Sequence, residues 1–162
     1  MTESTPMATK AAILIESLTG NTWKAGEKVA GLLSQEGWSI TGLNRMREPD
    51  HAAIQDADMV LLGTWVHGMF VVGQAPWGLA TLRGLPAMRD KKAAVFCTFA
   101  LNPGNSLQKM TRAAWTLGAE VIGGLALSRS KLDEHCEIFA ERLHVAATAT
   151  ASTAPRSSSG AD

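Results

Sequence analysis

The chain has 162 residues, with 15 acidic and 15 basic side chains and therefore no formal net charge. This length suits one domain with a sizeable core, and the lack of a basic patch argues against nucleic acid as the main partner. No apolar stretch approaches the ~20 residues of a membrane span, and residues 1–10 lack the pattern of a signal peptide. We therefore expect a cytoplasmic protein that does not associate with a membrane.

The two cysteines, Cys97 and Cys136, lie far apart and are not accompanied by other potential metal ligands. Two buried or partly buried thiols are a better interpretation of this pattern than a disulfide or a zinc site. We expect no metal site.

Short apolar runs alternate with helical patterns along the chain. We expect strands at 10–15, 38–43, 59–64, 93–99 and 120–127. Helices are expected at 22–35, at 77–82, from 106 onward, and in a last segment whose inward face is Leu132, Cys136, Phe139 and Leu143. The runs at 59–64 and 93–99 are almost unbroken, which is typical of strands buried on both faces, whereas 38–43 alternates as an edge strand does.

This alternation predicts an α/β fold, a three-layer sandwich in which helices cover both faces of a five-stranded parallel sheet. We expect a single domain at residues 10–146. Residues 1–9 are expected to fray. The tail 147–162 is rich in Ala, Thr, Ser, Pro and Gly and is expected to be disordered.

The loop after the first strand, residues 16–22 with the sequence ESLTGNT, is the most informative stretch. It holds hydroxyl groups, a glycine and an asparagine, but no lysine or arginine. Backbone N–H groups at a helix N-terminus, joined by short hydroxyl side chains, form a neutral cradle for a phosphate. Gly20 allows a tight turn, Asn21 tolerates unusual backbone angles, and Thr22 stands where an N-cap is expected. The alternative is an ordinary capped turn rich in small residues.

Two more loops are expected to converge on this one. In a doubly wound sheet of strand order 2-1-3-4-5, ligands bind beyond the carboxyl ends of the strands, between strands one and three. The loops 64–73 and 98–105 lie at that edge, and each has an aromatic residue, Trp65 or Phe99, directly after its strand. Two such rings can sandwich a flat ring system, and the alternative is that they cover the core. His67 is either a ligand-binding group or an exposed loop residue.

The stretch SLTGNT at 17–22 resembles the phosphate loop of flavodoxins, and residues 11 to about 143 are similar to the short-chain members of that family in motif order and spacing. The resemblance implies the flavodoxin-like fold and non-covalently bound FMN. The FMN phosphate would lie on the 17–22 loop, and backbone near 66–68 and 100–104 would reach the polar edges of the flavin ring. The residues expected to bind FMN are Ser17, Leu18, Thr19, Gly20, Asn21, Thr22, Thr64, Trp65, Val66, His67, Gly68, Thr98, Phe99, Ala100, Asn102 and Gly104.

Flavodoxins carry electrons, and the resemblance implies a flavin that cycles between oxidised, semiquinone and hydroquinone states. Such a carrier needs no catalytic residue, and none stands out in the sequence. The implied partners are a reductase and an electron acceptor, with the protein a monomer or weak dimer. Two alternatives remain open on the same fold. One is an FMN-dependent NAD(P)H or quinone reductase, or a protoporphyrinogen-oxidase-like enzyme. The other is a flavin-free interaction module.

Four features depart from the family pattern. Phe99 stands near the position where many flavodoxins stack a tyrosine, the 100–105 loop has no acidic residue, the chain is neutral rather than acidic, and Glu16 adjoins the phosphate loop. Nearby negative charge disfavours an anionic reduced flavin, so we expect a less negative hydroquinone potential than in an acidic flavodoxin. The neutral surface also weakens the expectation of electrostatic docking to a basic reductase.

Overall fold

The computed structural model describes residues 8–17, 20–66 and 79–152, in which strands and helices alternate. The strands are β1 (Lys10–Ile15), β2 (Ser39–Arg45), β3 (Met59–Trp65), β4 (Lys92–Phe99) and β5 (Glu120–Ser128). The helices are α1 (Asn21–Gln35), α2 (His51–Asp56), α3 (Leu79–Arg83), α4 (Ser106–Thr116) and α5 (Leu132–Ser152). A single 3-10 turn, Arg129–Lys131, precedes α5.

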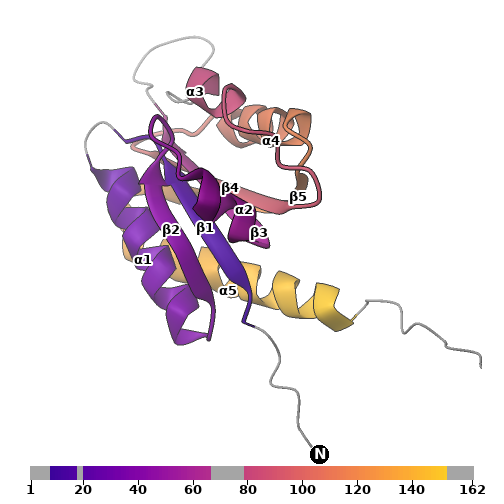
Figure 1. The fold of residues 1–162 in the computed structure, drawn as a ribbon. Coiled ribbons are helices and arrows are strands. Elements are labelled where there is room, and N and C mark those ends of the chain that lie inside the picture. The colour runs from indigo at the N-terminus through magenta and orange to yellow at the C-terminus, as the bar shows by residue number, and fades with distance from the viewer. Residues whose placement is uncertain (1–7, 18–19, 67–78, 153–162) are drawn as a thin grey trace, which may run out of the picture.

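All neighbouring strands pair in parallel, and the strand order is β2-β1-β3-β4-β5. Helices α1 and α5 cover one face of this sheet, and α3 and α4 lie on the other (Figure 1). The expected α/β architecture and strand order are thus confirmed. The first three crossovers bring the carboxyl ends of β1, β3 and β4 to one edge of the sheet, where the loops predicted to form a site begin.

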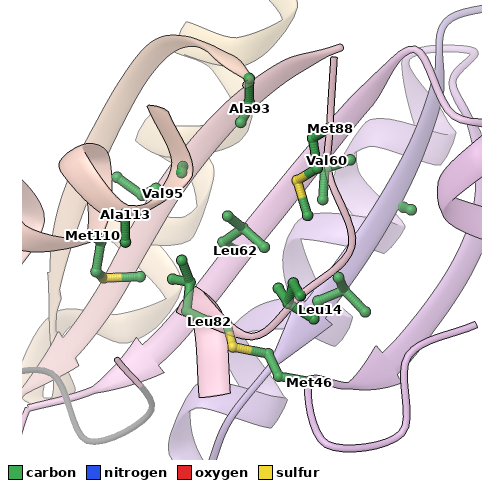
Figure 2. Close-up of a cluster of buried hydrophobic side chains, with 14 of the residues drawn as sticks. Leu14, Met46, Val60, Leu62, Leu82, Met88, Ala93, Val95, Met110 and Ala113 are labelled. Carbon is green, nitrogen blue, oxygen red and sulfur yellow. The ribbon is translucent and has the colours of Figure 1, made fainter. Parts of the chain in front are cut away.

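The period-2 alternation of a strand divides the apolar runs between two cores. Leu14, Leu62 and Val95 point into the core under α2, α3 and α4, where they meet Leu82 and Met110 (Figure 2). The alternate residues Ile13, Leu61 and Phe96 point into the core under α1 and α5. All six strand side chains are at most 1% exposed, which explains why these runs read as continuous hydrophobic sequence.

Phe96 occupies a space that depends on a glycine in the neighbouring strand. Gly63 of β3 faces its β4 partner Phe96, and a Cβ atom built on Gly63 would collide with the Phe96 ring. On its other side the ring packs against Phe139 of α5, with 5.5 Å between ring centroids. Gly63 therefore provides room for a large aromatic residue in the core.

Helix α5 continues to Ser152 and so enters the segment expected to be disordered. Residues 147–152 are helical because Ala147 still packs against the core under α1 and α5, and alanine has the highest helix propensity. Nearer its middle, the helix is joined to the turn after α1 by a hydrogen bond in which Trp38 Nε1 donates to His144 Nδ1 at 3.0 Å. The expectation for this part of the tail was wrong.

Candidate functional site

The predicted phosphate loop joins β1 to α1, and its described part ends in a left-handed glycine. Gly20 is the N-cap of α1 with φ +88°, and its backbone N–H donates to Ser17 Oγ at 3.1 Å. A glycine cap has no side-chain oxygen, and the first turn of α1 contains no acidic residue. An anion at this helix end would therefore meet backbone N–H donors and the positive end of the helix dipole. Leu18 and Thr19 lie outside the described residues.

Hydrogen bonds connect the beginnings of the three predicted loops. The N–H of Glu16, after β1, donates to the carbonyl of Gly63 in β3 at 2.9 Å, and the N–H of Val66, after β3, donates to the carbonyl of Thr98 in β4 at 2.8 Å. The hydroxyl groups of Thr22 and Thr98 are 2.7 Å apart. The structure thus brings the loop starts together at the carboxyl edge of the sheet.

Three threonines of the predicted site direct their hydroxyls into the protein. Thr22, Thr64 and Thr98 are fully buried, and Thr64 Oγ1 donates to Met110 Sδ at 3.5 Å. Thr22 is the second residue of α1 and not its N-cap, because the helix begins one residue earlier than expected. In this structure the Thr22 and Thr98 hydroxyls bond each other and do not face a ligand.

The two aromatic residues that end β3 and β4 differ in exposure. Trp65 is only 6% exposed, so little of its ring is open to a ligand. Phe99 is half-buried and packs at the margin of the core under α3 and α4. Phe99 thus fits the alternative that these rings cover the core, and contact of either ring with a ligand stays a prediction.

The third loop is an exposed turn closed by its own side chain. Gly104 has φ +57°, and its N–H donates to Asn102 Oδ1 at 2.9 Å. Ala100 and Asn102 are exposed, as is Gly104. Loop backbone thus faces solvent beside Phe99. His67 and Gly68, from the second loop, fall outside the described residues.

Sequence reasoning missed two arginines at this edge of the sheet. Arg45 ends β2, where it pairs in register with Ile15 of β1, and it lines a pocket of about 270 Å³ together with Ser17, Gly20 and Trp23. The expected strand order could have placed Arg45 beside the predicted phosphate loop. In that order strand two lies next to strand one, so the carboxyl ends of the two strands are adjacent.

The second arginine, Arg47, neutralises the carboxylate that adjoins the phosphate loop. Glu16 is 8% exposed, and its Oε1 accepts the Arg47 Nε at 3.0 Å. Its other oxygen, Oε2, is buried and has no hydrogen-bond partner in the part of the chain that the structure describes. Because the carboxylate is paired, its repulsion of a bound phosphate is reduced.

Both cysteines are buried free thiols. Burial raises the pKa of Cys97 to about 12 and, with a smaller contribution from the Asp133 carboxylate, that of Cys136 to about 11. Within residues 8–17, 20–66 and 79–152 no three potential metal-ligating side chains come together. Nor does any helix in those ranges combine the length and apolar character needed to cross a bilayer.

A five-stranded parallel sheet of order 2-1-3-4-5, with a glycine-capped helix after its first strand, is the arrangement of a flavodoxin-like domain. The sequence profile of the flavodoxin domain matches residues 12–118, and the chain therefore belongs to this family. No curated protein sequence matches the chain significantly.

Solved structures share the fold at low sequence identity. Oxidised flavodoxin 1 from Bacillus cereus has a TM-score of 0.64 and 20% identity over 85% of this chain and 98% of its own. The flavodoxin of Streptococcus pneumoniae has a TM-score of 0.64 and 23% identity, over 85% of this chain and 99% of its own. Rubredoxin oxygen:oxidoreductase from Desulfovibrio gigas has a TM-score of 0.59 and 18% identity. The match covers 85% of this chain but only 37% of that protein. The same fold thus occurs alone and within a larger protein.

Proposed function

We propose that this protein binds FMN non-covalently and transfers electrons between protein partners. The observation that carries the proposal is the N-terminus of α1, where Gly20 provides a left-handed cap and no side-chain acceptor, and the first turn lacks acidic residues. Membership of the flavodoxin domain family supports the same ligand. The donor chemistry fits a phosphate monoester, which accepts several backbone N–H groups at once.

The phosphate would be held by the N–H groups at the start of α1 and by the Ser17 hydroxyl, and it would replace Ser17 Oγ as the acceptor of the Gly20 N–H. Leu18 and Thr19, which lie outside the described residues, are the other residues predicted for this cradle. Arg45 lines the same pocket as Ser17 and Gly20. Its guanidinium would add positive charge to this pocket. The Arg47 partner of Glu16 keeps the neighbouring carboxylate from opposing this charge.

The flavin ring would lie over the third loop, beside Phe99 and the backbone of Ala100, Asn102 and Gly104. Trp65 and Val66, with His67 and Gly68 beyond them, would border the ring from the second loop. Bound FMN supplies one- and two-electron redox chemistry, whereas the chain provides binding, orientation and exclusion of water. A side chain that donates or removes protons is not required for this role. The two proposed partners are proteins, a reductase that supplies electrons and an acceptor that receives them.

The test is an absorption and fluorescence titration of the purified full-length chain with FMN and with riboflavin, followed by stepwise reduction. We expect FMN to bind more tightly than riboflavin and to be reduced in two one-electron steps. Consumption of NAD(P)H by the isolated protein would instead indicate a reductase. Failure to bind either flavin would reject the proposal and favour an interaction module.

The N-cap glycine of α1 and a glycine within the helix provide a matched pair of variants. Gly20→Ala places a side chain at φ +88°, where it is strained, and we expect FMN binding to weaken about tenfold or more. Gly31→Ala lies in the body of the same helix with open space around it. It should leave FMN affinity unchanged and slightly stabilise the fold.

A further inference from the structure

The outer edge of β5 is an unprotected sheet edge. β5 pairs with β4 on one side, and no other described strand pairs with its outer side. Residues 121–128 contain no charged residue and no proline, although natural edge strands usually carry such groups to prevent pairing with another chain. The irregularity in β5 lies between Val121 and Gly123, which leaves a regular edge from Gly123 to Ser128.

A wide groove runs beside this edge. It has a volume of about 1060 Å³ and lies between α4 and β5, with Leu107, Trp115 and Val121 among its lining residues. Trp115 is 71% exposed, the highest value among the large apolar side chains described. Gly123 and Gly124 also line the groove and are exposed. Without side chains at these two positions, another backbone can approach β5 closely.

The charges at the two ends of β5 have opposite signs. Glu120 begins the strand, and Arg129 and Lys131 lie in the 3-10 turn that follows it. Among the ion pairs of the described residues, none involves Glu120 or Lys131. If a second β5 lies antiparallel along the edge, each Glu120 meets the Arg129–Lys131 turn of the other copy. A parallel arrangement would instead bring Glu120 against Glu120.

We propose that two copies of this chain associate by antiparallel pairing of their β5 edges, which forms a continuous sheet across a twofold axis. The arrangement is self-complementary and closes after two copies, because each copy offers the same surface. The absence of net charge on the chain removes general repulsion between the copies. The groove shares no lining residue with the pocket around Arg45, so this proposal does not depend on FMN binding.

The experiment is sedimentation velocity on the full-length chain from micromolar to millimolar concentration. We expect a concentration-dependent species of twice the 17.2 kDa chain mass. Gly123→Lys should abolish it, because it places a charged side chain on the pairing strand. A Cβ at Gly123 meets no atom within 4 Å, so the monomer can accommodate the change. Circular dichroism and thermal unfolding verify that the variant monomer is folded.

A charge exchange tests the direction of pairing. Glu120→Lys and Lys131→Glu should each weaken the dimer about tenfold at low salt, since each creates two like-charge contacts across the axis. The double variant should restore the dimer. Glu27→Lys makes the same charge change on the exposed surface of α1 and serves as the control. A monomer at all concentrations, assemblies larger than two, a dimer unaffected by Gly123→Lys, or a double variant without recovery would each overturn the proposal.

Discussion

The hydroxyl groups of Thr22 and Thr98 form a fully buried hydrogen bond of 2.7 Å between the first turn of α1 and the end of β4. Each hydroxyl is removed from water, and the hydrogen bond to the other hydroxyl replaces the hydrogen bonds to water that it has lost. The bond also joins the start of α1, after the first predicted loop, to the end of β4, before the third.

Replacing one threonine of this pair with valine should destabilise the protein by about 1–3 kcal/mol, because the remaining hydroxyl stays buried without a partner. The double variant should be much less destabilised than the sum of the two single variants, since both hydroxyls are then absent. Urea unfolding of the four proteins measures this coupling. Additive effects would show that the two hydroxyls do not depend on each other.

Replacing Arg45 with alanine should weaken FMN binding about fivefold to tenfold at low salt, and high salt should reduce this difference. Riboflavin has no phosphate, so its affinity should not change. Arg142→Ala removes the same charge from the exposed surface of α5 and provides the control. An equal loss of affinity for both flavins would mean that Arg45 acts on the shape of the pocket and not on the phosphate.

The Glu16–Arg47 pair predicts effects of opposite sign. Glu16→Gln should tighten FMN binding, because it removes a negative charge next to the phosphate. Arg47→Gln should weaken FMN binding and cost about 1 kcal/mol of stability, a modest value because the Arg47 side chain is 64% exposed. Flavin titration measures the FMN affinity of each variant, and urea unfolding measures its stability. If Glu16→Gln and Arg47→Gln changed the FMN affinity in the same direction, the electrostatic explanation would be contradicted.

The buried thiols predict both reactivity and pH dependence. Because their pKa values are raised to about 12 and about 11, neither Cys97 nor Cys136 should react with a thiol reagent at pH 8 in the folded protein, whereas both should react in urea. The folded state retains these protons above the ordinary thiol pKa of 9.0 and the unfolded state releases them. Stability should therefore be unaffected below about pH 9 and fall as the pH rises above it.

Asn102 offers a test of the redox environment. Its Oδ1 accepts the N–H of Gly104, and an aspartate at this position can accept the same hydrogen bond. Asn102→Asp should therefore preserve the turn while adding a negative charge to a loop that has none. We expect the potential of the second electron to become more negative by on the order of tens of millivolts. A spectroelectrochemical titration with no shift would place the flavin away from this loop.

The sequence predicted the fold well because its signals are strong and local. The buried runs in β3 and β4 and the glycine after α1 mark their elements directly, and the alternation of strands and helices leads to the parallel sheet. The burial of Thr22 was missed because the sequence placed this residue at the N-cap, whereas it lies within α1 on the same buried face as Ala25.

The positions of Arg45 and Arg47 depend on β2 lying beside β1, which is a non-local relationship. Their charges are visible in the sequence, but no local pattern shows which other loop lies beside them. The end of α5 was mispredicted for a different reason. Composition alone favoured disorder there, whereas the contact of Ala147 with the core favours helix.

The predicted site exists only in the folded chain. Its three loops are connected through hydrogen bonds across neighbouring strands, and Thr22 and Thr98 are 76 positions apart in the sequence. A ligand of this site therefore binds the native state alone and shifts the folding equilibrium in its favour, by ~2.7 kcal/mol when its concentration is ~100 times its dissociation constant. The amount of folded protein in a cell should consequently follow the supply of that ligand, so that starvation for it would expose the chain to proteolysis.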